Sequence, residues 1–334
     1  MDKKDLRSGN IALLRNLLKS MRQATKPQLA KASGLSVVTV NAIMKVLTES
    51  GEAVATEVAP STGGRKALIY VFRADRRLSL TAYTTMAQTN DAENAENTES
   101  LKLTVAVNDI FGEKKDGGEY VLSEATPAAF AEILSPFTQK YPQIPMIVLG
   151  LDGKTAANTE DAAEYRDIPF DRQMTAKLER QVKIINETEA AAANADHFFG
   201  KPVADGIVVT VNWPPLMPPV ASIMVGGEIF RGRDGIAGAI GRRFFGTAYH
   251  KPLDIVREAA RTIVMLTRVL NPHGIILYGE DFADDTAAAV TERAIREIPE
   301  KYLPNFAVRQ TIAEDYAAGI VKLTGKYLAA LDDE

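Results

Sequence analysis

The chain has 334 residues, of which 46% are hydrophobic and 25% charged, with a formal net charge of −4, no cysteine and 3 histidines. This length allows two or three domains with a substantial core, and the composition is that of an ordinary globular protein. Disulfides and thiolate metal sites are excluded, no apolar run approaches the roughly 18 residues that cross a bilayer, and residues 1–4 lead into no signal-peptide core, so we expect a protein of the cytoplasm without a metal or a membrane partner.

The first part of the chain has the pattern of a helix-turn-helix. Residues 10–18 are apolar at helical spacing and predict a first helix. Thr25 can cap a second helix through Lys31, because its hydroxyl accepts from free backbone N–H groups and Pro27 is tolerated in the first turn. Gly34 then suits a turn that needs a positive φ. These signals predict two helices that lead into a tight turn.

A third helix is expected from the cap residue Ser36 to about Ser50, with Gly51 ending it. One face of this helix is predicted to be buried because its apolar residues recur at helical spacing: Val40, Ile43, Met44 and Leu47. The opposite face is the one that a recognition helix turns toward base edges, and it carries Ser36, Val37, Thr39, Asn41 and Lys45. Val37 and Val38 stand where many DNA-binding helices carry Lys, Arg or Gln, which predicts sparse base readout.

A hairpin follows this helix, with strands expected over residues 53–58 and 66–72. Its tip contains Gly64, Arg65 and Lys66. The glycine lets the backbone come close to DNA, and the two cations can reach a groove or phosphates. The hairpin therefore has the composition of a DNA-binding wing.

Charge separates a DNA-binding unit from the alternative, a small helical module that binds other proteins. Residues 1–80 hold 14 Lys and Arg against 6 Asp and Glu, a net charge of +8, so the rest of the chain carries −12. Lys and Arg displace the counterions of the phosphate backbone, which favours duplex DNA as the partner of this unit.

After a charged linker at residues 73–77, strands and helices alternate. Strands are predicted over residues 78–85, 101–107, 119–121, 145–151, 182–185, 206–211, 221–225, 274–278 and 307–311. Helices are predicted over residues 127–140, 173–181, 188–199, 252–270, 286–297 and 313–331. The polar stretch 88–100 has nothing to bury, and we expect an exposed hairpin loop there.

This order predicts an α/β body of two lobes behind the helix-turn-helix. We place the DNA-binding domain at residues 1–77, the first lobe at 78–190 and the second lobe at 191–312. The closing helix, residues 313–331, is assigned to the first lobe. No short internal repeat is visible in the sequence.

Five segments, in the same order along the chain, resemble the ROK family of repressors and sugar kinases. They are the N-terminal unit ending in Gly64-Arg65, Asn-Glu-Thr-Glu-Ala-Ala-Ala at residues 186–192, Gly-Gly-Glu-Ile-Phe-Arg-Gly at 226–232, Gly-Ile-Ala-Gly-Ala-Ile-Gly-Arg at 235–242, and Leu-Asn-Pro-His-Gly-Ile-Ile-Leu-Tyr-Gly at 270–279. The resemblance implies a winged helix-turn-helix joined to a two-lobed body with the actin-like, sugar-kinase-like (ribonuclease H-like) fold.

Two ATP contacts that the resemblance implies are missing. Family kinases begin the body with a phosphate loop that contains an acid and glycines, whereas residues 82–87 read Ala-Tyr-Thr-Thr-Met-Ala. The second, glycine-rich loop is replaced by the proline-rich stretch 212–219, and proline has no backbone N–H with which to hold a phosphate. We therefore expect no enzyme activity and no cofactor.

The sugar side is altered as well. The family's Asn-Asp pair, whose Asp takes a proton from the sugar hydroxyl in the kinases, is Asn186-Glu187 here, one methylene longer. The family's Glu-x-Gly-His motif ends in Arg242, and guanidinium pairs well with carboxylates and phosphates. Two interpretations remain open: a cleft that binds an anionic sugar derivative, or a cleft that binds nothing and serves only to orient the DNA-binding units.

We thus predict a DNA-binding transcriptional regulator, a repressor by preference, that acts as a homodimer or a dimer of dimers on an operator in double-stranded DNA. A sugar or sugar-acid effector would change the spacing of its readers. The alternatives are a sugar kinase of the ROK family, or a body used only for dimerisation and for docking a protein partner.

Overall fold

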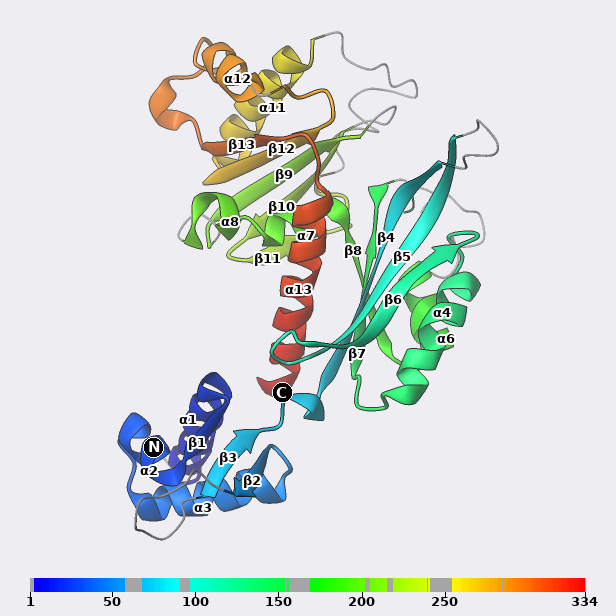
Figure 1. Ribbon diagram of the computed structural model, residues 1–334. Helices are drawn as coiled ribbons and strands as arrows, with labels where there is room; N and C mark the ends of the chain where they lie inside the picture. The colour runs from blue at the N-terminus through cyan, green and yellow to red at the C-terminus, as the bar shows by residue number, and fades with distance from the viewer. Residues whose placement is uncertain are drawn as a thin grey trace. The chain divides into compact units, whose positions relative to one another are not determined.

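The computed structural model describes residues 3–57, 68–90, 97–153, 155, 169–201, 205–214, 219–238, 240, 254–283 and 285–333. The chain divides into two compact units. The N-terminal unit comprises Met1–Leu78 with Asp109–Phe111, and the body comprises Ser79–Asn108 with Gly112–Glu334. Figure 1 shows the elements of each unit.

The described residues of the N-terminal unit form three α-helices and a small sheet. Its strands run in the order β1-β3-β2, all antiparallel. The elements are α1 (Lys3–Met21), β1 (Gln23–Thr25), α2 (Lys26–Ser33), α3 (Val37–Glu49), β2 (Ala53–Glu57), β3 (Leu68–Phe72) and a 3-10 turn, η1 (Ala74–Arg76). The three predicted helices and both predicted hairpin strands are confirmed within the described residues; β1 is an additional strand.

The helix boundaries follow from the predicted caps. Thr25 forms a capping box with Gln28, whose side chain accepts from the Thr25 backbone N–H at 2.8 Å. Gly34 takes the left-handed conformation at φ 70° after α2, and Ser36 accepts from the Thr39 backbone N–H at 3.1 Å at the start of α3. The predicted stripe of α3 is fully or almost fully buried, in a core it shares with residues of α1, α2 and β3.

Glu52 connects several elements of this unit. Its carboxylate accepts from Arg15 Nε of α1 at 2.5 Å and from Ser50 Oγ at 3.0 Å, and it lies 3.4 Å from Arg76 of η1. Burial raises the pKa of Glu52, but these hydrogen bonds and the two positive charges outweigh burial, so its pKa lies below the ordinary value. The carboxylate is therefore ionised and held in place.

Replacing Glu52 with Gln is expected to destabilise the N-terminal unit by about 1–3 kcal/mol at neutral pH, because the guanidinium groups lose a charged acceptor. Because the pKa of Glu52 is lower in the folded state, its ionised carboxylate stabilises the fold fully above the ordinary carboxyl pKa. This stabilisation is lost as the pH falls through the lowered pKa. The difference in the free energy of unfolding between wild type and variant should become smaller at acidic pH. Hydrogen exchange of the α1 and α3 amides would measure it. Glu49→Gln, on an exposed side chain, is the control; an equal effect there would contradict the prediction.

In the body, the described residues form two five-stranded sheets. The first has the order β6-β5-β4-β7-β8 and the second β11-β10-β9-β12-β13. The first sheet and its helices are β4 (Leu78–Asn90), β5 (Asn97–Asp109), β6 (Lys114–Leu122), α4 (Pro127–Lys140), β7 (Met146–Leu151), α6 (Phe170–Leu178) and β8 (Gln181–Asn186). The second set is β9 (Ile207–Trp213), β10 (Val220–Val225), β11 (Glu228–Phe230), α11 (Ile255–Leu270), β12 (Gly274–Gly279), α12 (Thr286–Ala294), η3 (Glu300–Tyr302) and β13 (Asn305–Arg309).

The two sheets have the same topology. In each, the first three strands in sequence form one side of the sheet, and the fourth and fifth strands pair in parallel beside the first. A helix precedes the fourth strand (α4, α11) and another precedes the fifth (α6, α12). The body is therefore a structural duplication that the sequence does not show as a repeat.

A helix also follows the fifth strand of each sheet, and these two helices pack against each other (Figure 1). They are α7 (Glu187–Ala193), which is followed by α8 (Asp196–Phe199), and α13 (Ala313–Asp333). The contact is close: a Cβ on Gly319 of α13 would lie 1.7 Å from the carbonyl oxygen of Ala190 in α7. Both helices belong to a core that includes residues of β7, β8 and β10, so they join the two sheets. The assignment of α13 to one lobe stays a prediction.

Two predicted elements are wrong in extent. In the stretch 88–100, where a loop is expected, residues 88–90 belong to β4 and residues 97–100 to β5, while residues 91–96 lie outside the described residues. An antiparallel hairpin satisfies its own backbone groups and needs no apolar side chains. The helix expected over residues 188–199 breaks into α7 and α8, because Asn194 leaves helical geometry and donates its side-chain N–H to the buried Asp315 at 2.8 Å. Several other boundaries shift by a few residues.

Within the described part of the chain, no single helix is both long and apolar enough to cross a membrane. The pair α2 and α3 passes a test of length and composition together, but the two helices are bent by 115°.

Candidate functional site

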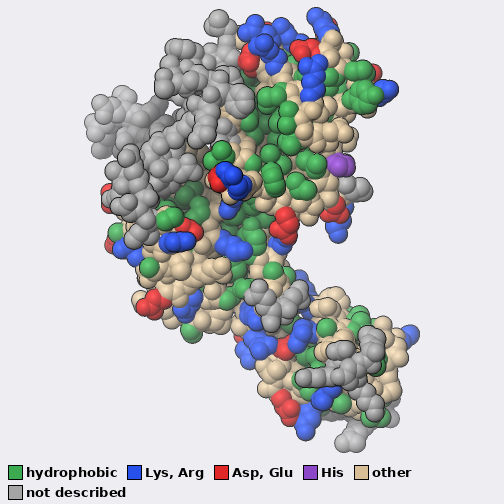
Figure 2. Space-filling model, turned by 180° about the vertical axis from the view of Figure 1, so that it is seen from behind, with side chains coloured by type: hydrophobic (Ala, Val, Ile, Leu, Met, Phe, Trp, Pro, Cys, Tyr) green, Lys and Arg blue, Asp and Glu red, His purple; other side chains and the backbone are tan. Residues whose placement is uncertain are grey.

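The predicted DNA-reading face of α3 lies outside the core of the N-terminal unit. Ser36, Val37, Asn41 and Lys45 are exposed, and Thr39 is half-buried. Figure 2 shows Lys and Arg side chains on one face of this unit. Gly64, Arg65 and Lys66, predicted at the wing tip, lie outside the described residues.

In the body, the predicted pair Asn186-Glu187 lies where β8 ends and α7 begins. Asn186 is the cap of α7: its Oδ1 accepts from the Glu189 backbone N–H at 2.8 Å, and Glu189 Oε2 accepts from the Asn186 backbone N–H at 3.0 Å. Asn186 Oδ1 also accepts from Thr188 Oγ1 at 2.8 Å and from Ser222 Oγ at 3.2 Å. The residue is thus fixed in position by the helix that it caps and by β10 of the second sheet.

Glu187 points to a different set of partners. Its Oε1 accepts from Asn212 Nδ2 at 2.7 Å, and a Cβ on Gly153 would lie 3.1 Å from the same oxygen. Burial raises the pKa of Glu187 to about 7; hydrogen bonds from Asn212 and from the Gly153 backbone act against burial, and the negative charge of Asp152 adds to it. The group can exchange a proton near neutral pH.

A Glu187→Gln variant should gain stability relative to wild type as pH rises. A folded-state pKa above the unfolded value means that the protonated carboxyl stabilises the fold fully below the unfolded pKa, and that this contribution is lost as pH rises through about 7. Glutamine keeps the neutral form at every pH. The melting temperature of the variant should exceed that of wild type at pH 8 but not at pH 5. An equal difference in melting temperature at both pH values would contradict the raised pKa.

Asp152, at the end of β7, is a site residue that the sequence analysis missed. It is 7% exposed, and its carboxylate accepts from the Thr155 backbone N–H at 3.0 Å and from Thr155 Oγ1 at 2.7 Å. Its own backbone N–H donates to Thr84 Oγ1 at 2.9 Å. Asp152 and Glu187 thus bring two carboxyl groups into one partly buried region at the carboxyl ends of β7 and β8, where ligands bind in open α/β sheets.

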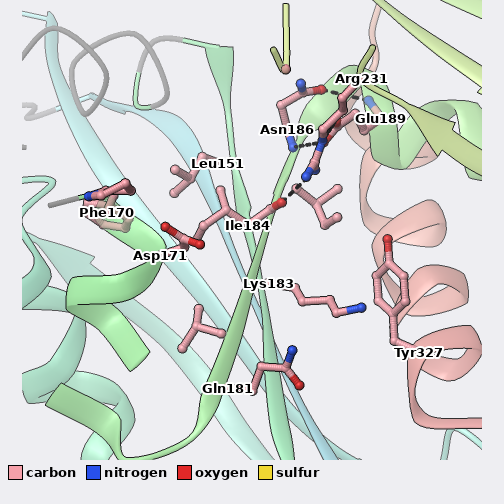
Figure 3. Close-up of a pocket in the computed structure, with 14 residues that line it drawn as sticks. Leu151, Phe170, Asp171, Gln181, Lys183, Ile184, Asn186, Glu189, Arg231 and Tyr327 are labelled. Carbon is pink, nitrogen blue, oxygen red and sulfur yellow. Dashed lines mark hydrogen bonds and ion pairs between the residues drawn. The ribbon is translucent and has the colours of Figure 1, made fainter. Parts of the chain in front are cut away.

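A cavity of about 730 Å³ lies along β8. Its lining includes Asn186, Lys183, Arg231, Asp171 and Tyr327 (Figure 3). Arg231 is held by Glu189, at 2.5 and 2.8 Å, and by the carbonyl oxygen of Ile184 at 2.9 Å. The ammonium of Lys183 lies 4.0 Å from the centre of the Tyr327 ring.

The cations that the structure places in this cavity are Arg231 and Lys183, whereas the sequence analysis named Arg242, which lies outside the described residues. Arg231 belongs to the segment 226–232, which carried the family resemblance. Its ion pair with Glu189, 42 residues earlier in the chain, could not be predicted from the sequence. Hydrogen bonds from the guanidinium to Glu189 raise the pKa of Arg231, so it is a permanent cation whose Nε and Nη2 groups are already engaged by that carboxylate.

Of the two segments expected to replace phosphate loops, the structure describes the first completely and the second in part. Residues 82–87 lie inside the continuous strand β4, so the chain makes no turn there. In the second segment, Trp213 is 7% exposed and packs on Phe282 with ring centroids 5.8 Å apart, while residues 215–218 lie outside the described residues.

Among the described residues, no group of three or more His, Asp or Glu side chains is placed so that it could hold a metal ion. His273 instead accepts from the Ile207 backbone N–H at 3.0 Å and has a packing role.

The fold defines a class: a helix-turn-helix unit with a β hairpin, joined to an α/β body whose two sheets share one topology. No protein-family model matches the chain. Two curated proteins are 30% identical to it over 123 residues, the bifunctional enzymes NanE/NanK of Brucella suis biovar 1 and Brucella melitensis biotype 1. The match covers 36% of this chain and 23% of each relative, so the chain spans about a quarter of their length.

Solved structures extend the similarity to the whole chain. A ROK family transcriptional regulator, described as a homolog of the E. coli MLC protein, superposes with a TM-score of 0.51 and 15% identity over 96% of both chains. The ROK hexokinase from Thermus thermophilus superposes with a TM-score of 0.52 and 16% identity, over 76% of this chain and 99% of its own. The chain therefore has the ROK family fold, which regulators and sugar kinases share.

Proposed function

We propose that the chain is a ROK-family transcriptional regulator whose N-terminal unit binds duplex DNA. The observation that carries the proposal is the geometry of α2 and α3: both helices begin at their predicted caps, one face of α3 is buried and the other is exposed. A helix held in this way, with an antiparallel hairpin after it, is the arrangement in which a recognition helix enters the major groove. The net charge of +8 on residues 1–80 supplies the attraction to phosphate.

The body, in this proposal, does not transfer phosphate. Residues 82–87 continue β4 where a family kinase needs a phosphate loop, and the prolines of residues 212–219 remove backbone donors. The body keeps a sensing role, with a sugar or an anionic sugar derivative as the effector and Asn186, Glu187 and Arg242 as the residues proposed to contact it. An effector controls DNA binding only to the extent that it binds one arrangement of a dimer more tightly than the other.

The test is the affinity of the full-length chain for duplexes selected from a randomised library, measured between 50 and 200 mM salt. We expect specific binding that weakens with salt, because each neutralised phosphate makes the slope of log K against log salt more negative by about 0.9. Lys45→Gln on α3 should weaken binding, and Lys177→Gln, an exposed lysine on helix α6 of the body, should not. No selected duplex, or binding that ignores salt, would overturn the proposal.

A sugar kinase is the second candidate, and two observations favour it. The carboxyl of Glu187 has a pKa of about 7, which suits a group that takes a proton from a hydroxyl, and the 123-residue match is to enzymes named NanE/NanK. An ATP-coupled assay with a panel of hexoses and N-acetylated hexosamines separates the candidates. Turnover that disappears in Glu187→Gln would establish the kinase, and its absence supports the regulator.

A further inference from the structure

Two adjacent valines at the start of α3 do not contribute to the core. Val37 is 54% exposed and Val38 is 78% exposed, whereas Val40, in the same helix, is fully buried. Valine is a poor choice for an exposed helix position, because its branched side chain loses rotamer freedom there and gains no burial. Packing within the described N-terminal unit therefore does not account for these two side chains.

Their position is the one from which a recognition helix touches base edges. Both lie in the first turn of α3, directly after its cap. The cap is rigid: Ser36 Oγ accepts from the Thr39 backbone N–H at 3.1 Å and lies 2.8 Å from Thr39 Oγ1. These two hydroxyls are engaged with each other, which leaves the apolar side chains of Val37 and Val38 as the prominent groups of this turn.

The next turn of the same face completes a chemical pattern. Asn41 and Ala42 are exposed; Asn41 lies four residues after Val37, and Ala42 lies four residues after Val38, so each shares the side of the helix of one valine. The one basic residue of α3 is Lys45, which lies 3.8 Å from Glu49. In the major groove, Asn pairs with adenine, apolar groups contact the thymine methyl, and guanine is read mostly by Arg or Lys. Of the four exposed residues Val37, Val38, Asn41 and Ala42, three have apolar side chains, and Asn41 carries the amide that suits adenine.

We infer that α3 selects A·T base pairs, with Val37 and Val38 covering thymine 5-methyl groups and Asn41 reading adenine. The inference rests on the proposed DNA binding and adds which base pairs α3 selects and which side chains contact them. Covering a methyl group removes apolar surface of both partners from water, which would make the exposed valines a source of affinity in the complex only.

The experiment uses the full-length chain and two randomised duplex libraries, one made with thymidine and one with deoxyuridine, which lacks the 5-methyl group. Selection from the thymidine library should enrich A·T pairs in each half-site, and the deoxyuridine library should enrich poorly. In a selected duplex, changing one contacted thymidine to deoxyuridine should weaken binding about fourfold, the value of one buried methyl.

Val38→Ala should weaken binding to the thymidine duplex by a similar factor and should lose sensitivity to that deoxyuridine change. The loss of sensitivity identifies the contact, since a merely structural defect would leave the effect of the methyl intact. Val121→Ala, at a valine of β6 in the body that is 72% exposed, is the matched control and should change neither value. Salt-dependent binding with equal affinity for thymidine and deoxyuridine duplexes would overturn the inference and leave the proposed function standing; no binding to either library would remove both.

Discussion

Replacing Gly319 with alanine should lower the free energy of unfolding of the body by roughly 3 kcal/mol. The added Cβ would lie 1.7 Å from the carbonyl oxygen of Ala190 and 2.4 Å from its carbonyl carbon, distances that no side-chain rotation can relieve. Helices α7 and α13 would have to move apart, and with them the core that joins the two sheets. Chemical denaturation followed by the fluorescence of Trp213 measures the loss.

Gly325, on the same helix, gives the matched control. A Cβ there meets nothing within 4 Å, and the residue is exposed. Gly325→Ala should therefore stabilise the body, by about 0.5–1 kcal/mol, because alanine is the better helix former and restricts the unfolded chain. If both variants shifted the free energy of unfolding in the same direction by similar amounts, the close approach of α7 and α13 would not be the reason for Gly319.

The contrast between these two glycines shows where sequence reasoning stops. Nothing local distinguishes Gly319 from Gly325, since each interrupts an otherwise ordinary helical pattern. The difference lies in what the other half of the duplicated body brings against the helix, and that depends on the fold. The duplication of the body could not be predicted from the sequence for the same reason. The two sheets share one strand order, but their sequences do not repeat.

Elements with local signals were predicted well. The caps Thr25 and Ser36 and the turn residue Gly34 act within four residues of themselves, so their effects could be derived from the sequence and the structure confirms them. Polar strands had no such signal. The sequence of residues 88–100 predicts a loop because it holds few apolar residues to bury, yet the described residues 88–90 and 97–100 belong to β4 and β5.

The candidate site was accessible only in part. Asn186 and Glu187 could be named from their motif, and the structure adds that their side chains have separate partners, Ser222 for the first and Asn212 for the second. Asp152 could not be named, because its relation to Glu187 arises from two parallel strands whose ends meet. Their roles in binding an effector stay a prediction.

The N-terminal unit offers the second large effect. Leu47 of α3 is fully buried in the core that α1, α2, α3 and the small sheet share. Leu47→Ala leaves a cavity and should cost about 2–5 kcal/mol. A unit of this size has little stability to lose, so we expect it to be largely unfolded at 37 °C while the body keeps its melting transition. Circular dichroism and hydrogen exchange resolve the two units.

In Leu47→Ala, DNA binding should be lost when the N-terminal unit unfolds. Val37, Val38 and Asn41 form one continuous surface only while α3 is packed against the core of that unit. Leu134→Ala is the matched control: Leu134 is also fully buried, but in α4 of the body. It should weaken the body and leave salt-dependent DNA affinity close to that of wild type. If Leu47→Ala unfolds the N-terminal unit and affinity for a selected duplex persists, the DNA contact is made by the acidic body, and α3 is not the recognition helix.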